Sequence, residues 1–230
     1  YTQYALERNR LSDIDSSLLV SPTYSYWANK GWQWSSSFNY TLSFDNRDRV
    51  FNATQGNVFR YDGTLSGGPL RGDIHFIKQE LEFSKLIPEG KNFIGAFSIK
   101  TGYIRGIYHP DSIPFYERFF LGDVGPYGLR GYELRSVGPV ENGVNVGGRI
   151  YFIFTLEERY RINDNVYLLA FFDAGNAFKN VNTLRPFIVK KGVGVGIRME
   201  VPMMGILGFD FAYGIDSKKW IPHIQIGTTF

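Results

Sequence analysis

The feature that most constrains this chain is a strict alternation of side chains between Trp32 and Asp45. Every second residue is Trp, Phe, Tyr or Leu, apart from Ser36, and the residues between them are only Gln, Ser, Asn, Thr or Asp. Successive side chains of a β-strand point to opposite faces, so this pattern predicts a strand with one apolar and one polar face. Comparable alternation recurs along the chain and predicts an all-β protein.

About ten strands are predicted in this way. Their approximate ranges are 1–10, 32–45, 57–67, 74–87, 93–105, 147–162, 165–178, 189–201, 206–216 and 222–230. Most exceed the ~5–6 residues typical of soluble sheets and reach the ~9–11 residues that a tilted membrane strand needs. No segment reaches the ~18 apolar residues expected of a membrane helix. These lengths favour a transmembrane antiparallel β-barrel over a soluble sandwich.

The predicted connections alternate in length. Short links occur at 88–90 and 163–164, whereas the links at 11–31 and 106–146 are long. Outer-membrane barrels have short periplasmic turns and longer external loops, so this alternation favours the same fold. The link at 46–56 is an exception, because it is fairly long on the side of the short turns.

Four tryptophans lie near the predicted strand ends on the side of the long loops. They are Trp27, Trp32, Trp34 and Trp220. Tryptophan is enriched where a membrane meets water, because its ring is apolar and its N–H needs a polar partner. We expect these side chains to anchor the barrel at one membrane surface.

Composition argues against several other functions. The net charge is only +3, with scattered basic residues, so a nucleic-acid partner is not expected. The chain has no cysteine, and its three histidines lie far apart without metal-ligand spacing, so no metal or cofactor is predicted. Neither a nucleophile elbow nor a phosphate-binding glycine loop occurs. We therefore expect no enzymatic activity.

The inward faces of the predicted strands are expected to carry charged or very small side chains. Gly192, Gly194 and Gly196 follow one another along one inward face. A row of glycines in a strand usually marks the close approach of another backbone. The long segment 106–146, with its glycine-rich centre at 125–132, is the predicted occupant of the lumen.

An arginine at the centre of this segment, Arg130, would need acidic partners inside a barrel, because an unpaired buried charge is costly. By alternation, Glu157 and Asp173 face inward on two adjacent predicted strands. A guanidinium group can bind a carboxylate through two parallel hydrogen bonds. We predict that Arg130 ties the long segment to Glu157 and Asp173. The alternative is a solvated loop arginine.

These residues also resemble the motifs of the BamA-like outer-membrane assembly and translocation superfamily. The run Gly128-Leu129-Arg130-Gly131-Tyr132 looks like the family's lumen-loop motif. The later matches are Gly147-Gly148 with Glu157, the strand containing Phe171, Asp173 and Gly175, and a terminal-strand signal with Ile224, Ile226, Gly227 and Phe230. In the family the loop arginine contacts the acidic strands, so the resemblance implies the same pairing.

The resemblance implies a location in the bacterial outer membrane. Family barrels have sixteen strands and follow periplasmic POTRA domains, whereas residues 1–230 supply about ten strands and no POTRA sequence. We therefore expect one domain, the C-terminal part of such a barrel.

The implied function is assembly and insertion of β-barrel proteins through a seam between the first and last strands. We expect the last strand to begin at Pro222. The implied partners are unfolded outer-membrane clients, accessory lipoproteins and membrane lipid. The alternatives are a two-partner secretion pore, which exports an unfolded polypeptide, and a passive or structural barrel.

Overall fold

The computed structural model describes residues 1–109, 113–185, 187–201 and 204–227. Within these residues the fold is a ten-stranded antiparallel sheet in the order β1-β2-β3-β4-β5-β8-β9-β10-β11-β12. The strands are β1 (Thr2–Asn9), β2 (Gln33–Asp45), β3 (Gly56–Ser66), β4 (Phe76–Pro88), β5 (Phe93–Gly106), β8 (Ile150–Arg161), β9 (Val166–Phe178), β10 (Lys190–Val201), β11 (Gly205–Gly214) and β12 (Lys219–Ile226). Each strand pairs with its sequence neighbour, except that β5 pairs with β8 across the long loop.

The number and order of the strands confirm the predicted all-β antiparallel architecture. The predicted start of the last strand was wrong, because β12 begins at Lys219 and Pro222 lies within it, opposite Phe211. Proline cannot donate to a β-ladder, but it is tolerated in a strand that has a free edge. A small hairpin of β6 (Val140–Glu141) and β7 (Val144–Asn145), and the helix α1 (Pro22–Ala28), were not predicted.

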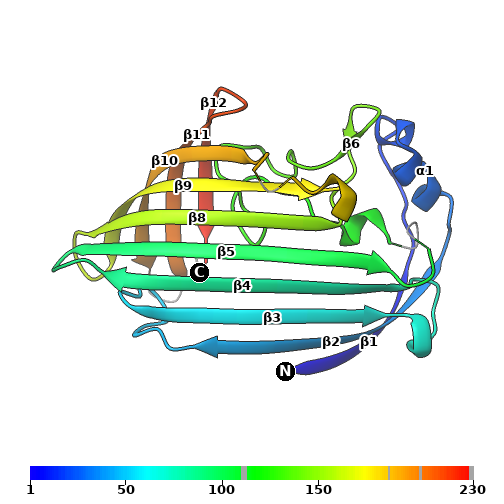
Figure 1. Cartoon of the computed structure of the whole chain (residues 1–230), viewed down its shortest axis with the longest axis horizontal. Helices are drawn as coiled ribbons and strands as arrows, with labels where there is room; N and C mark the ends of the chain where they lie inside the picture. The colour runs from blue at the N-terminus through cyan, green and yellow to red at the C-terminus, as the bar shows by residue number, and fades with distance from the viewer. Residues whose placement is uncertain (110–112, 186, 202–203, 228–230) are drawn as a thin grey trace.

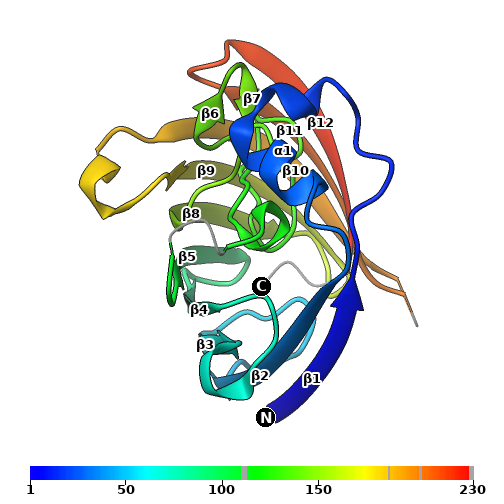
Figure 2. The ribbon, with the colours of Figure 1, turned by 90° about the vertical axis from the view of Figure 1, so that its right-hand side faces the viewer.

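The sheet curves around a central lumen. Figure 1 shows β2 to β9 running side by side, with β10 starting beside β9 and bending toward the steeply inclined β11 and β12. Figure 2, a view along the strands, shows an incomplete ring around the green segment between β5 and β8, with α1 near one opening. This is the predicted barrel-type sheet with the long loop folded into its lumen. We call the end bearing α1 the long-loop end and the opposite end the short-turn end.

The two faces of the sheet differ as the alternation predicts. On the outer face of β2, Leu42 is 61% and Phe44 is 58% exposed. On the inner face of β5, Ile94 and Ile104 are buried. Exposed apolar side chains along whole strands are costly in water and favourable in lipid, so the outer face is suited to a bilayer. No helix among the described residues is long and apolar enough to cross a membrane.

The long-loop half of the lumen contains a hydrophobic core, so the prediction of only charged or very small inward side chains was incomplete. Ile104 and Tyr151 from the wall pack there with Phe119, Leu121 and Leu129 from the long loop. These wall side chains are apolar because the loop covers them and excludes water. Alternation shows which side chains face inward, but not which of them a loop covers.

The segment between β1 and β2 folds over the long-loop end through α1. Trp27 in this helix is only 4% exposed and belongs to the same hydrophobic core, so its predicted role as an interfacial anchor was wrong. The Thr23 hydroxyl donates to Glu141 in the β6–β7 hairpin at 2.8 Å. The helix is therefore bound to the long loop.

The unexpectedly long link between β2 and β3 crosses the short-turn end. Asn52 donates to the carbonyl oxygen of Asp164 at 3.0 Å and to the Glu200 carboxylate at 2.8 Å. Ala53 is buried in a small apolar cluster with Leu86, Ile94 and Ala96. The link thus spans the opening between β3 and β10, which explains why it is longer than the other turns on this side.

Candidate functional site

The site is built where the long loop reaches the inner wall of β8, β9 and β12. At its centre the chain reverses direction between Asp123 and Tyr132. The Leu129 N–H donates to the Asp123 carbonyl at 3.0 Å, and the Asp123 N–H donates to the Tyr132 carbonyl at 2.8 Å. Gly131 has a φ of +91°, a conformation that glycine adopts without strain. Leu129 is fully buried in the lumen core, so Arg130 is presented to the wall from a fixed backbone.

Arg130 contacts both acidic residues predicted to bind it. Its Nε and Nη2 atoms donate to the two oxygens of Asp173 at 2.8 and 2.9 Å, and its backbone N–H donates to Asp173 at 3.1 Å. Its Nη1 atom donates to Glu157 at 2.8 Å. All three side chains are buried. The guanidinium fork therefore joins the loop to β8 and β9 at once.

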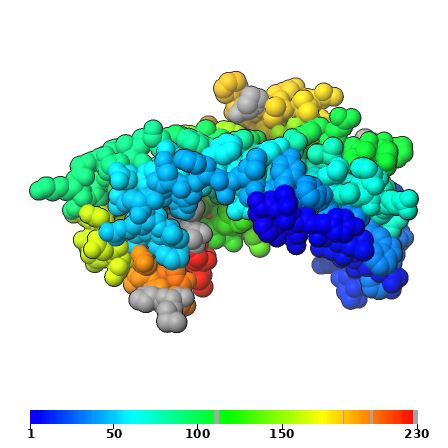
Figure 3. All heavy atoms as spheres, turned by 90° about the horizontal axis from the view of Figure 1, so that it is seen from below, coloured from blue at the N-terminus to red at the C-terminus, as the bar shows by residue number. Residues whose placement is uncertain are grey.

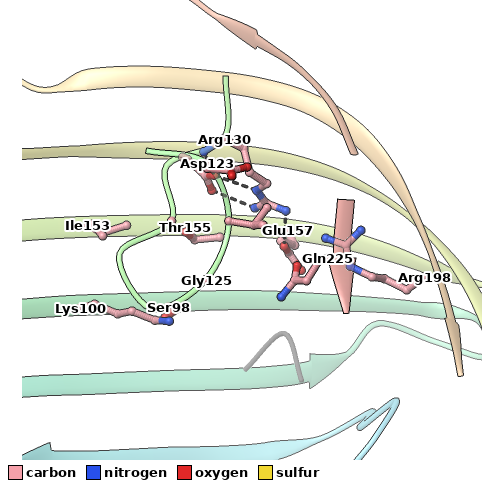
Figure 4. Close-up of a pocket in the computed structure, with 13 residues that line it drawn as sticks. Ser98, Lys100, Asp123, Gly125, Arg130, Ile153, Thr155, Glu157, Arg198 and Gln225 are labelled. Carbon is pink, nitrogen blue, oxygen red and sulfur yellow. Dashed lines mark hydrogen bonds and ion pairs between the residues drawn. The ribbon is translucent and has the colours of Figure 1, made fainter. Parts of the chain in front are cut away.

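An aromatic ring supports the same guanidinium group. The Arg130 carbon Cζ lies 3.6 Å from the centroid of the Phe171 ring, a favourable cation–π geometry. Figure 4 shows Arg130 reaching from the loop toward Glu157, with Arg198 and Gln225 approaching from other strands. The fourth residue predicted on this wall, Gly175, lies on β9, where an added Cβ would sit 2.7 Å from the Phe152 carbonyl oxygen.

Of the three glycines in the row on β10, Gly192 contacts the loop, whereas Gly194 and Gly196 contact the neighbouring strands. A Cβ atom added at Gly192 would collide with the carbonyl oxygen of Arg130. One added at Gly194 would lie 2.5 Å or closer to the Phe171 ring and the Phe211 carbonyl oxygen. The loop and wall are thus in backbone contact at Gly192, as the row of glycines suggested.

The loop is also bonded to the terminal strand, through a residue that sequence reasoning did not single out. The Gly131 N–H donates to Nε2 of His223 at 3.0 Å, and Nδ1 of His223 lies 2.6 Å from Asp123. Because Nε2 accepts, the ring proton is on Nδ1 and is donated to Asp123. The alternation of side chains in β12 places His223 on the inner face, but it does not show which residue His223 contacts there.

Replacing His223 with Phe should loosen this contact while keeping a ring of similar size. It leaves the Gly131 N–H and Asp123 without their partner, at a cost of ~1–3 kcal/mol for a buried unsatisfied group. The urea midpoint of the folded chain in lipid vesicles should fall. Ile224→Phe is the matched control, because it puts the same ring on the exposed outer face. Equal midpoints for the two variants would show that the contact does not hold the loop.

Tyr132 completes the contacts of the motif. Its hydroxyl lies 2.9 Å from both the Asp216 carboxylate, in the turn between β11 and β12, and the Lys191 carbonyl oxygen. Burial and the hydrogen bond to Asp216 raise the pKa of Tyr132 to about 12. The hydroxyl is therefore neutral near pH 7 and available as a donor. Together, Arg130, Gly131 and Tyr132 join the loop to every strand from β8 to β12 or to its turns, and we call this set of contacts the loop clamp.

Two further ion pairs surround the loop clamp. Arg159 donates to Glu157 at 2.7 Å, and Arg198 binds Asp210 through two hydrogen bonds of 2.6 and 2.8 Å. The Nη1 atom of Arg130 lies 3.8 Å from Asp210, so the two sets are electrostatically connected. Each buried charge here has a partner of opposite sign, as burial requires.

The residues of the predicted terminal signal lie apart from the loop clamp. Ile224 and Ile226 are 64% and 68% exposed on the outer face of β12. The Gly227 N–H donates to the Ile206 carbonyl at 2.8 Å, which extends the pairing with β11. Phe230 lies outside the described residues.

The remaining lumen is polar. A cavity of about 650 Å³ lies between the loop and β2 to β5, and Asp45, Arg60, Glu82 and Lys100 are among its lining residues. Lys100 lies 3.3 Å from Glu82. No group of three His, Cys, Asp or Glu side chains in the described part of the chain is placed to hold a metal ion. The site thus combines a loop held against the inner wall with the edge strand β12.

Comparison with known proteins identifies the family. The model of the Omp85 superfamily domain matches residues 1–230. The chain is 28% identical over 223 residues to the outer membrane protein assembly factor BamA of Nitratidesulfovibrio vulgaris, covering 94% of this chain and 27% of that protein. It is 27% identical over 154 residues to the sorting assembly machinery 50 kDa subunit of Saccharomyces cerevisiae, covering 63% and 30%.

A solved structure shares the fold. The crystal structure of BamA from Haemophilus ducreyi lacking POTRA domains 1–3 superposes with a TM-score of 0.71 at 18% identity, covering 98% of this chain and 48% of that one. The chain spans less than a third of the two curated relatives and about half of the solved chain. The fold and the relatives confirm the predicted integral outer-membrane location. This chain belongs to the Omp85 superfamily.

Proposed function

We propose that this chain assembles and inserts β-barrel proteins into the outer membrane by offering the free edge of β12 to a client strand. The observation that carries the proposal is that β12, within the described residues, pairs only with β11. An unpaired strand edge exposes N–H and C=O groups that can template another strand. The names of the BamA and sorting-machinery relatives support an assembly role.

The shape of the molecule supports access to this edge. In Figure 3 the dark blue atoms of β1 are separated from the orange and red atoms of the C-terminal strands, and green atoms of the long loop lie between them. β12 is short, and Pro222 supplies no N–H for pairing. We infer that a client strand reaches the edge of β12, at the seam facing β1, more readily than any strand that is paired on both sides.

The loop clamp holds β12 in place at the proposed seam. His223 holds the lumen face of β12 to the loop while the outer residues Ile224 and Ile226 remain exposed. A strand held in this way stays extended when its edge is free. This reduces the conformational entropy that β12 itself loses when a client strand pairs with it. The activity is non-covalent and needs no catalytic residue. The proposed partners are unfolded outer-membrane clients, accessory lipoproteins of an assembly complex, and lipid.

A crosslinking experiment tests the proposal. The chain has no cysteine, so Ile224→Cys introduces a single thiol on β12. We expect this thiol to form a disulfide with a cysteine in the terminal strand of a client barrel during its insertion into vesicles. Phe209→Cys is the matched control, because Phe209 lies directly opposite Ile224 on β11, which is paired on both sides.

The same vesicles report the rate of client folding. Faster client folding in the presence of the chain, with crosslinks at position 224 and few at 209, supports the proposal. Equal crosslinking at both positions, or client folding at the rate of empty vesicles, contradicts it. Passage of an unfolded polypeptide into the vesicle interior without crosslinks at 224 would instead support the export pore.

A further inference from the structure

The loop between β9 and β10 carries four apolar side chains that are exposed to different degrees. Val181 is 60% exposed, Leu184 36%, Phe187 93% and Ile188 66%. Such a set of exposed apolar side chains is rare on a surface in contact with water and marks a site of contact with protein or membrane.

The same loop is strongly basic. Residues 179–191 contain four basic residues and no acidic one, although the whole chain has 25 basic and 22 acidic residues and a net charge of only +3. The basic residues are Lys179, Arg185, Lys190 and Lys191. Lys179 lies 3.3 Å from Glu141, which joins the loop to the β6–β7 hairpin. A basic segment bearing exposed apolar side chains has the chemistry of a membrane-surface anchor.

The loop lies on the lipid side of the barrel. Asn176 occupies an outward position of β9, and its side-chain N–H donates to the Ile188 carbonyl at 3.0 Å. Figure 2 shows this yellow loop projecting away from the lumen, and Figure 3 shows it standing out from the outer surface of the sheet. Its base is continuous with the outer face of β9, so its exposed side chains lie on the outer side of the sheet at the long-loop end.

The loop has its own local structure. A 3₁₀ turn, η5 (Val181–Thr183), is closed by reciprocal hydrogen bonds in which Thr183 N–H donates to the Asn180 side chain at 3.0 Å and Asn180 N–H donates to the Thr183 hydroxyl at 3.1 Å. Nη1 of Arg185 donates a hydrogen bond to the Leu184 carbonyl oxygen at 3.1 Å. The turn fixes the backbone at Val181 and Leu184, which reduces the entropy lost when these two side chains bind.

We propose that this loop anchors the barrel at the membrane surface by binding anionic lipid headgroups. Arg185 and Lys191 contact headgroup phosphates, while Val181, Leu184 and Phe187 enter the boundary with the acyl chains. Each basic residue near an anionic membrane surface strengthens such binding about fivefold, and salt weakens it. Lys191 contributes because its neighbour Gly192 faces the Arg130 carbonyl in the lumen, so the Lys191 side chain faces outward.

A fluorescent label at one position of the loop tests this anchor. Val181→Cys, labelled with an environment-sensitive dye, is folded into vesicles of phosphatidylcholine with or without phosphatidylglycerol, both containing lipid with a shallow spin label. We expect quenching of the dye to be stronger in the anionic vesicles. Arg185→Gln with Lys191→Gln should lower the ratio of bound to free loop about fivefold for each charge removed.

The matched control removes two charges at the other end of the barrel. Lys85→Gln with Lys91→Gln changes the net charge equally, but both residues lie at the short-turn end of β4 and its link to β5. These changes should leave the quenching unaltered. A gel-mobility shift on heating confirms that each variant is folded. A dye that is unquenched in both lipids overturns the proposal, and so does equal quenching in both lipids that is insensitive to Arg185 and Lys191.

Discussion

Replacing Arg130 with Met should destabilise the folded barrel by ~3–5 kcal/mol, the usual cost of removing one partner from a buried ion pair. Arg130 donates three hydrogen bonds to the buried Asp173 carboxylate. One of these comes from the backbone, so the side-chain change removes two directly and weakens the third. The measurement is the free energy of unfolding in urea from lipid vesicles, and client folding should slow in parallel.

A double-mutant cycle separates the contact from general damage. Adding Asp173→Asn to the Arg130→Met chain should restore part of the loss, because a neutral amide is less costly to bury unpaired than a carboxylate. Glu157→Gln is the comparison, and it should recover less, because Glu157 keeps Arg159 at 2.7 Å. We expect a coupling of ~1–3 kcal/mol between Arg130 and Asp173. Strictly additive losses would mean that the two residues act independently.

Replacing Gly192 with Val should displace the loop without changing any charge. A side chain at this position collides with the Arg130 carbonyl oxygen, a backbone atom that cannot turn aside as a side chain could. Overpacking of this kind typically costs ~1–3 kcal/mol, and here it also pulls the guanidinium away from Asp173. In the folded protein, limited trypsin digestion should then cut after Arg130, which is 6% exposed in the clamped loop.

The control adds the same number of carbon atoms where there is room. Ala170 lies on the outer face of β9, opposite Val195, so Ala170→Leu enlarges a side chain in contact with lipid. It should leave the trypsin site protected. Protection of Arg130 in both variants would show that the loop does not rest on Gly192.

The loop clamp connects the acidic residues of β8 and β9 to the edge strand β12. Arg130 binds β8 and β9, and Gly131, the next residue, binds β12 through His223. Loss of the contact between Arg130 and the acidic residues can therefore displace Gly131 and weaken its hydrogen bond to β12. If the clamp controls the seam, Arg130→Met should alter crosslinking at position 224 as well as stability, whereas Ala170→Leu should alter neither.

The sequence by itself determined the elements that depend on local periodicity. Alternation of side chains defined the strands, and the same parity placed Glu157 and Asp173 inward, because a β-strand has a period of two whatever surrounds it. The row of glycines from Gly192 predicted a close contact, since the absence of a Cβ is a property of the residue itself. The need of a buried Arg130 for acidic partners followed from the cost of an unpaired charge.

Only the tertiary structure decided which distant groups meet. His223 and Asp123 are a hundred residues apart, and nothing in their local sequence joins them. The sequence predicts Trp27 to be an interfacial anchor, whereas α1 places it in the core. It predicts Pro222 at the start of a strand, whereas the pairing with Phe211 places Pro222 inside β12. The physical reason is that parity shows which way a side chain points, whereas its partner depends on how the sheet curves and how deeply the loop enters the lumen.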